Sequence, residues 1–355
     1  QPGVGQGTTV SAMDGMDRGA APGPLRLAVL LASVSLATDL ANAPAPVLAL
    51  LDGGVESAVT THPAAQFHPA VDGGRVVYAD NRNGSYDIFM RDLSTGVETL
   101  VVGDSDTQQH PGVSQDFVVW EDWRGTGVKI RALDLRTGVE FQPQVGGAGV
   151  ESHPRLSGHR VVYGTNRNSN HDVYMFDFDL NAEVAIAADP KATSHDPDIG
   201  GDLVVWQENW GGADDPDIVM RDLSAGAAAV SVQITGSTAA QSNPATDGVR
   251  VVYQDVRHGN NEIYMYDPAT GVETRITNNA ASQRNPDISG NVIVWEDERH
   301  GHSDIYAYDI STGTEHRITT HSSNQVQPSI SGNRIVWHDG RNGNANVYMF
   351  TLAGS

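Results

Sequence analysis

Three histidines stand at one recurring place in the chain, directly before a proline: His68, His110 and His153. Imidazole nitrogens are common ligands of divalent transition metals. These three residues are therefore the candidate metal ligands of the sequence. The alternative is a turn position that requires any polar side chain, because other residue types occupy the same place later in the chain. Those residues are Asp196, Asn243, Asn285 and Gln327.

Two tryptophans interrupt otherwise regular loops. Trp123 and Trp210 stand where other copies of the pattern have Asn, Val, Glu or Gly, and Asp214 and Asp215 follow the second one. An exposed indole beside glycines and carboxylates can stack on a sugar ring or contact a partner protein. We therefore predict a ligand-binding surface at these four residues. The alternative is that each indole folds back over its own loop.

A third pattern places an arginine between two acids, as in Asp297, Arg299 and Asp304. We expect the arginine to bridge the two carboxylates through charge-assisted hydrogen bonds. Clustered carboxylates also suit Ca²⁺. However, the arginine would occupy the centre of such a loop, and its charge would oppose the cation. The pattern thus favours a structural contact.

Signatures of catalysis and of anionic partners are missing. The sequence has no Gly-x-Ser-x-Gly, no His-Glu-x-x-His and no phosphate-binding loop, so we predict no catalytic residue. The formal net charge of -22 disfavours nucleic acids and anionic membranes as partners. The absence of cysteine excludes disulfides and thiolate metal sites.

A proline followed by an apolar-Ser/Asp-Gly step marks a repeat of 42 to 47 residues that must position these side chains. The prolines are Pro69, Pro111, Pro154, Pro197, Pro244, Pro286 and Pro328. Within each unit, short runs alternate between apolar and polar residues, as in Val292–Glu296 and Asp304–Ile310. Such alternation between turn residues indicates strands. Four strands in each unit, repeated radially, predict an all-β fold, the β-propeller.

The two ends of the repeat array complete each other. Gly54–Pro69 resembles Gly271–Pro286, but no repeat precedes it, and the last unit stops without a fourth strand. We therefore predict that Val55–Thr60 supplies that strand. The count is then seven four-stranded blades in one domain over residues 54–352.

The first 53 residues are expected to be a leader. Arg18 and Arg26 flank the short apolar run Leu27–Ala37, which is too short to span a bilayer. This arrangement is typical of a secretory signal peptide, over residues 16–37 approximately, followed by a linker. The alternative is an apolar leader without this role. The prediction places the mature protein outside the cell, in the periplasm or on the cell surface, without membrane insertion after signal removal.

The repeat resembles that of TolB-type propellers. Its form, P-x-I-S-G-x-x-V-V-W-x-D-x-R-x-G-x-x-D-I-Y-x-Y-D-x-x-T-G-x-E-x-x-I-T, is similar to tandem versions on bacterial and archaeal cell-surface proteins. Signatures of other propeller families, such as the Gly-His…Trp-Asp pair, are missing. The resemblance covers nearly all of residues 54–352. It implies a propeller and leaves the activity open, because one fold hosts many functions.

We therefore predict a secreted or cell-surface, non-catalytic binding propeller with no cofactor. The expected partner is a protein or a cell-surface glycan, and the expected state is a monomer. The alternative is a polysaccharide-active enzyme, because oligogalacturonate lyases resemble TolB-type propellers and use a metal held by His and Gln. The resemblance would then give His68, His110 and His153 a role in holding a divalent cation.

Overall fold

The structure is a computed structural model that describes residues 53–143, 149–210 and 215–353. These residues belong to the second of two units of the chain, which spans residues 46–355. The predicted signal peptide and Asp214 lie outside the described residues. None of the residues described forms a helix that is long and apolar enough to cross a membrane.

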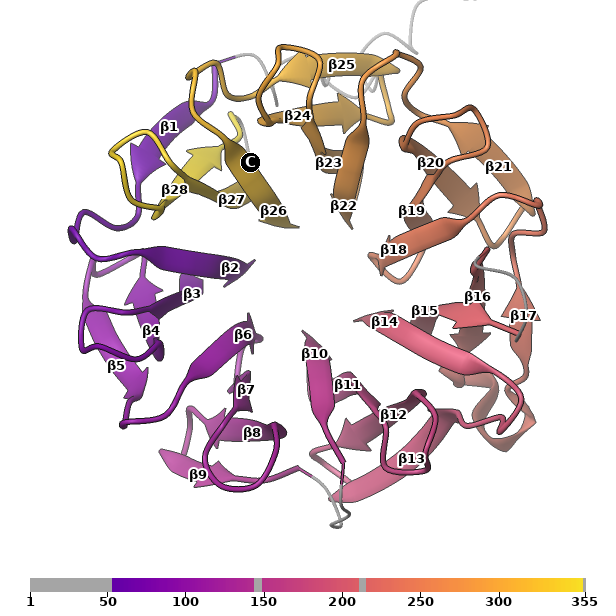
Figure 1. The fold of residues 1–355 in the computed structure, drawn as a ribbon, viewed down its shortest axis with the longest axis horizontal. Helices are drawn as coiled ribbons and strands as arrows, with labels where there is room; N and C mark the ends of the chain where they lie inside the picture. The colour runs from indigo at the N-terminus through magenta and orange to yellow at the C-terminus, as the bar shows by residue number, and fades with distance from the viewer. Residues whose placement is uncertain (1–52, 144–148, 211–214, 354–355) are drawn as a thin grey trace, which may run out of the picture. The chain divides into compact units, whose positions relative to one another are not determined.

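The described residues form seven four-stranded antiparallel sheets arranged around a central axis (Figure 1). In chain order, blades 1 to 3 are β2 (Gln66–Asp72), β3 (Arg75–Asp80), β4 (Asp87–Asp92) and β5 (Glu98–Val102); β6 (Gln108–Val113), β7 (Phe117–Asp122), β8 (Lys129–Asp134) and β9 (Val139–Phe141); and β10 (Glu151–Ser157), β11 (Arg160–Thr165), β12 (Asp172–Asp177) and β13 (Ala182–Ala187). Blade 4 is β14 (Thr193–Gly200), β15 (Leu203–Asn209), β16 (Asp217–Asp222) and β17 (Ser231–Gln233), with the 3₁₀ helix η2 (Leu223–Ala228) between its last two strands. Blades 5 to 7 are β18 (Gln241–Thr246), β19 (Val251–Asp255), β20 (Glu262–Asp267) and β21 (Val272–Arg275); β22 (Gln283–Ser289), β23 (Val292–Asp297), β24 (Asp304–Asp309) and β25 (Thr314–Arg317); and β26 (Gln325–Ser331), β27 (Arg334–Asp339), β28 (Asn346–Thr351) and β1 (Val55–Ala58). The seven-bladed propeller is confirmed.

The strand that closes the ring lies where the comparison of the repeat units predicts it, in the last blade. β1 pairs antiparallel with β28, with Val55 opposite Thr351 and Ala58 opposite Tyr348. In Figure 1 the indigo β1 lies beside the yellow β28, so the two ends of the array share one sheet. This pairing covers the strand edge that β28 would otherwise expose, and an exposed edge is a site for aggregation.

The hydrophobic core lies between neighbouring blades. One buried cluster joins Val292 and Ile305 of blade 6 to Ile330 and Trp337 of blade 7. The second strand of each blade carries a fully buried aromatic residue at the same position, as the alternating pattern predicts. These residues are Tyr78, Trp120, Tyr163, Trp206, Tyr253, Trp295 and Trp337.

The first strand of each blade contains the proline of the repeat. β22, for example, begins at Gln283, three residues before Pro286. The register shifts between Arg284 and Asp287, so the proline and the residue before it form a bulge. The cause is that proline has no N–H to donate, and a bulge removes it from the ladder.

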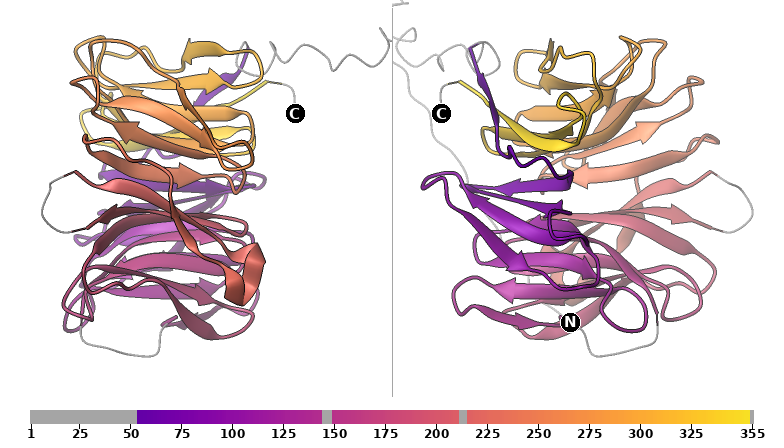
Figure 2. Two further views of the ribbon diagram at one scale, coloured as in Figure 1. Left: turned by 90° about the vertical axis from the view of Figure 1, so that its right-hand side faces the viewer. Right: turned by 60° about the vertical axis from the view of Figure 1, so that its left-hand side comes forward.

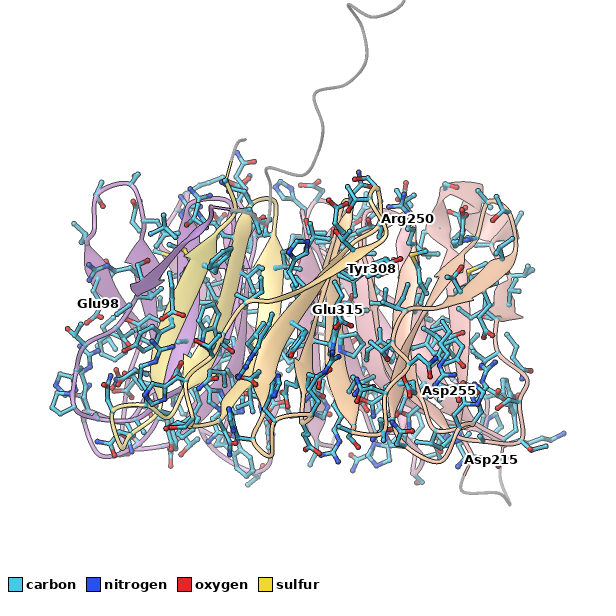
Figure 3. All side chains as sticks on the ribbon, turned by 90° about the horizontal axis from the view of Figure 1, so that it is seen from above. Glu98, Asp215, Arg250, Asp255, Tyr308 and Glu315 are labelled. Atoms are coloured by element: carbon cyan, nitrogen blue, oxygen red, sulfur yellow. The ribbon has the colours of Figure 1, made fainter. Side chains whose placement is uncertain are left out.

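The strands run between two faces of the ring (Figure 2). One face carries the loops that join the second strand to the third, together with the links from each blade to the next; we call it the loop face. The other carries the turns that join the first strand to the second; we call it the turn face. Figure 3 shows Asp215, from the loop after β15, and Arg250, from a turn before β19, on opposite faces.

Candidate functional site

The first strands of the seven blades line a central channel with a volume of about 550 Å³. The residues before the seven prolines all contribute to its wall, as the sequence predicts. Every one of them has a positive φ, between 45° and 54°. Asn, Asp and His tolerate this left-handed conformation better than most residues. The backbone of the bulge therefore explains why the position before each proline is polar. This favours the interpretation that the position requires a polar side chain for structural reasons. The seven residues are His68, His110, His153, Asp196, Asn243, Asn285 and Gln327.

The three predicted metal ligands are neighbours in this wall. The rings of His68 and His110 stack with their centroids 4.0 Å apart, and those of His110 and His153 are 5.6 Å apart. Burial and the neighbouring His110 lower the pKa of His68 to about 3, and burial also lowers the pKa of His153. These two imidazoles are therefore uncharged at neutral pH.

The histidines are close together but do not converge on one point. His110 Nδ1 lies 2.9 Å from a carboxylate oxygen of Glu121, and His153 Nδ1 lies 3.5 Å from Asp196. Across the described residues, no group of three or more His, Cys, Asp or Glu side chains is spaced to hold a metal ion. The three rings instead line one side of the channel.

A second belt of channel residues carries charge, and the sequence interpretation missed it. It follows the prolines by one position, where Arg155, Asp198 and Asp287 stand. Asp287 Oδ2 accepts a hydrogen bond from the Ile330 N–H at 2.9 Å. Burial and the nearby Asp198 raise the pKa of Asp287 to about 7. The signal in the sequence was the mixture of small and charged residues at this one position.

The two predicted tryptophans are exposed on the loop face. Trp123 is 49% exposed and Trp210 is 46% exposed. They belong to blades 2 and 4, with blade 3 between them. Asp215 is half-buried, and it adds to the effect of burial in raising the pKa of Asp217. The loop face therefore offers two separate aromatic contact points.

The arginine of the repeated loop makes a contact different from the predicted one. Arg299 Nε lies 2.8 Å from Asp297, as expected, but Nη1 lies 2.6 Å from Glu315 in the fourth strand. Its guanidinium also lies 4.2 Å from the centre of the Tyr306 ring. Asp304, the other predicted partner, instead accepts from Arg317 at 2.8 Å. The predicted contact with the first acid is confirmed. The predicted contact with the second acid was wrong, because the third strand places the fourth within reach of the arginine.

We call this contact between the loop arginine and a fourth-strand glutamate the clasp. Six blades have it, and blade 4 does not, in the part of the chain that the structure describes. The six pairs are Arg82–Glu98, Arg124–Glu140, Arg167–Glu183, Arg257–Glu273, Arg299–Glu315 and Arg341–Glu56. The last pair joins β1 to its blade, so the clasp also fastens the ring closure.

Blade 4 has lost both members of the clasp. Its strand register places Trp210 at the position of Arg299 and Ser231 at that of Glu315. Glu208, at the position of Asp297, accepts hydrogen bonds from Ser194 Oγ at 2.7 Å and from Trp206 Nε1. Trp210 thus occupies the position of a structural arginine. Its predicted placement where other units have Asn, Val, Glu or Gly was wrong, because of the two tryptophans only Trp123 occupies that position.

The family model of the TolB beta propeller domain matches residues 210–355. This part of the chain, from the end of β15 through blade 7, is similar to TolB-type propellers. A search of curated protein sequences gave no significant match.

Solved structures of other proteins share the propeller fold of this chain. An oligogalacturonate lyase in complex with manganese has a TM-score of 0.62 and 15% identity, and covers 84% of this chain and 93% of its own. An oligogalacturonate lyase from Vibrio parahaemolyticus has a TM-score of 0.64 and 11% identity, with coverages of 83% and 93%. The propeller domain of the Trilobed protease from Pyrococcus furiosus has a TM-score of 0.64 and 11% identity, with coverages of 83% and 95%. That domain is described as having an open velcro topology, whereas β1 closes the ring here.

Proposed function

We propose that this chain is a non-catalytic binding propeller that holds a protein or glycan ligand on its loop face through Trp123 and Trp210. The observation that carries the proposal is the exposure of two indoles, 49% and 46%, in loops where the other blades have no tryptophan. Aromatic side chains that are exposed on a free surface are enriched in binding sites, where burial of the ring contributes most of the energy.

Position within the ring strengthens this proposal. The two indoles directly follow second strands, β7 and β15. The backbone N–H of Trp123 donates to the Thr107 carbonyl at 3.0 Å. The backbone of this loop is therefore fixed before a ligand arrives, which reduces the entropy cost of binding. Asp215 adds a carboxylate next to the blade 4 loop, and a carboxylate can accept hydrogen bonds from sugar hydroxyls or from a basic side chain.

A glycan array and a pull-down from cell-surface extract test the proposal with three proteins. They are the wild type, the double variant Trp123→Ala/Trp210→Ala and the control Val256→Ala. Val256 occupies the loop position of Trp123 in blade 5 and is 36% exposed. We expect ligand signal from the wild type and the control and a loss of at least tenfold in the double variant. Unchanged signal in the double variant would exclude this surface.

A polysaccharide lyase is the second candidate. The fold similarity to two oligogalacturonate lyases and the row of histidines in the channel favour it. The test combines elemental analysis of the purified protein for manganese, calcium and zinc with an assay for unsaturated products from oligogalacturonate. Bound metal together with product, both lost in His110→Ala, would establish the lyase. Absence of both results would remove it.

We also propose that the chain acts outside the cytoplasm, on the basis of the signal peptide expected near residues 16–37. Expression of the full chain followed by N-terminal sequencing of the mature protein tests this. Cleavage close to Ala37 supports export. An intact leader on protein recovered from the cytoplasm contradicts it.

A further inference from the structure

A polar pair lies at each junction between neighbouring blades. Each pair joins the first residue of a third strand to a residue at the start of the first strand in the next blade. The backbone N–H of this first-strand residue donates to the carbonyl of the residue that precedes the third strand, as Gln108 N–H donates to the Tyr86 carbonyl. The pairs, in ring order, are Asp87 and Gln108, Lys129 and Glu151, Asp172 and Ser194, Asp217 and Gln241, Glu262 and Gln283, Asp304 and Gln325, and Asn346 and Gln66. Because the backbone contact repeats, the seven junctions can be compared directly.

The closing junction, between blades 7 and 1, contains the neutral pair Asn346 and Gln66, whose polar atoms are hydrogen-bonded. Gln66 Oε1 accepts from Asn346 Nδ2 at 2.7 Å and from Thr60 Oγ1 at 2.9 Å. The Gln66 amide nitrogen is directed to a backbone carbonyl of the preceding link, that of Ala64. The glutamine thus presents its amide oxygen to the junction, and two donors meet it there.

The junction between blades 1 and 2 presents the same amide oxygen but lacks the donors. Gln108 Nε2 donates to the Asp106 carbonyl and to Asp104, both at 3.1 Å, which directs Oε1 toward the junction. Asp87 stands where the closing junction has an asparagine, and Val102 stands where it has Thr60. The side chains of Asp87 and Gln108 are buried, at 1% and 0% exposure respectively. Within the described part of the chain, Asp87 Oδ1 and Gln108 Oε1 have no hydrogen-bond partner.

Space beside the carboxylate is kept open by a glycine. A Cβ built on Gly103 would come within 3.0 to 3.1 Å of the Asp87 carboxylate atoms. Any side chain at Gly103 would therefore crowd the carboxylate. Asp104 lies close enough for its charge to act on Asp87. The absence of a side chain at Gly103 thus leaves the Asp87 carboxylate uncrowded on this side.

The junction between blades 6 and 7 is the matched comparison. Asp304 Oδ1 and Gln325 Oε1 also have no hydrogen-bond partner among the described residues, and both side chains are fully buried. There, however, Arg317 supplies positive charge to Asp304 at 2.8 Å. The corresponding position in blade 1 is Leu100. Asp87 therefore has no arginine at this position: its Oδ2 accepts from Asn83 Nδ2 at 2.6 Å, a neutral donor that leaves the buried charge without a compensating cation among the described residues.

We propose that the junction between blades 1 and 2 binds one hard, calcium-type cation between Asp87 Oδ1 and Gln108 Oε1. Carboxylate and carboxamide oxygens are the ligands that Ca²⁺ prefers. The cation supplies the charge that Arg317 supplies between blades 6 and 7. The cation also contacts Gln108 Oε1, as Asn346 and Thr60 contact Gln66 Oε1 at the closing junction. The net charge of -22 favours cation uptake by the folded protein.

Asp172 in blade 3 is the nearest parallel, and it helps to define the site. Its Oδ1 is also buried without a partner in the described region, and Ala185 stands at the arginine position. It faces Ser194 rather than a glutamine, and the Ser194 hydroxyl donates to Glu208. This junction therefore lacks the second oxygen ligand that Gln108 provides.

Thermal unfolding of the full chain tests the proposal. The wild type, Asp87→Asn and Asp304→Asn are treated with EDTA at pH 8 and titrated with CaCl₂, with NaCl at matched ionic strength as the salt control. We expect saturating CaCl₂ to raise the Tm of the wild type by about 5 °C. Asp304→Asn is expected to keep this response, because Asp87 is intact. Asp87→Asn is expected to lose it, because its amide can donate to Gln108 without a metal.

Two results would overturn the site. One is an equal calcium response of the wild type and Asp87→Asn. The other is a wild type that responds to acid but not to calcium, which would show that a proton satisfies the pair. Should Asp87→Asn fail to fold, Gly103→Ala fills the space while keeping the carboxylate, and Tb³⁺ luminescence reports binding. Terbium emission with wild-type affinity in Gly103→Ala would also contradict the proposal.

Discussion

Blades 6 and 4 share a scaffold and differ in how their loops are held. Both bury a tryptophan in the second strand, Trp295 and Trp206, and both place an aspartate in the channel, Asp287 and Asp198. Blade 6 fastens its loop with the clasp between Arg299 and Glu315. Blade 4 has Trp210 and Ser231 at those positions.

The difference teaches that the clasp is dispensable for forming a blade and that its removal releases a surface position. Arginine and glutamate are lost together, so neither charge is left unpaired. Glu208 is retained with neutral donors, Ser194 and Trp206. The released position carries an indole that is 46% exposed. Blade 2 keeps its clasp, Arg124–Glu140, and still exposes Trp123, so only in blade 4 does the exposed indole replace the arginine.

The largest expected effect tests what the two blades share. Trp295→Ala and Trp206→Ala should each lower the free energy of unfolding by about 3–5 kcal/mol, because each leaves a cavity between blades. Urea unfolding followed by circular dichroism measures both. If Trp206→Ala lowers the free energy of unfolding far less than Trp295→Ala does, the cores beside blades 4 and 6 are not equivalent.

The next effect tests the clasp itself. Arg299→Ala leaves Asp297, which is fully buried, without its cation and should cost about 2–3 kcal/mol. Trp210→Ala, at the same position in blade 4, should change the free energy of unfolding by less than about 0.5 kcal/mol, since it removes an exposed side chain. Equal losses in the two variants, by the same urea assay, would remove the distinction between the blades.

A pH dependence follows from the aspartate of blade 6. The pKa of Asp287 is raised to about 7, so the folded protein holds a proton that the unfolded chain, with its ordinary pKa of 3.8, releases. This contribution to stability is complete below about pH 4 and is lost as the pH rises through about 7. Relative to the wild type, Asp287→Asn should therefore gain about 2–3 kcal/mol between pH 5 and pH 8.

The control for this prediction is Ser329→Ala, at the same channel position in blade 7. Unfolding free energies of the three proteins are compared at pH 5 and pH 8. A difference between Asp287→Asn and the wild type that stays constant with pH would show that Asp287 is ionised throughout.

The smallest effect rebuilds the missing contact. Trp210→Arg/Ser231→Glu should restore a clasp in blade 4 and raise the free energy of unfolding by about 0.5–1 kcal/mol, the range of a well-formed surface ion pair. Each single variant should gain less, because it introduces one charge without its partner. A double-mutant cycle with no coupling between the two positions would show that Glu208 and the blade 4 loop do not accept the clasp.

The fold was predictable because each signal is repeated seven times. Alternating strands, the turn residues and the buried aromatic position recur in every unit, and the match between Val55–Thr60 and later links predicted the closure. The clasp was missed because it depends on the register of the third and fourth strands. Arg299 and Glu315 lie 16 residues apart, and the loop sequence alone does not place them in contact.

The channel was only partly predictable. The ring that contains His68 followed from the prolines, but the stacking of its histidines follows from a bulge with positive φ that the sequence did not reveal. Arg155, Asp198 and Asp287 escaped notice because they lie within strands, where residues alternate between two faces. Trp123 and Trp210 were found because they depart from the repeat.

The most direct test of the central claim measures affinity across the two kinds of blade. A ligand identified on the array or by pull-down is titrated by calorimetry against the wild type, Trp210→Ala, Trp123→Ala and Arg299→Ala. Loss of at least tenfold in affinity in both tryptophan variants, with wild-type affinity in Arg299→Ala, is the predicted result. Wild-type affinity in both tryptophan variants would contradict the account.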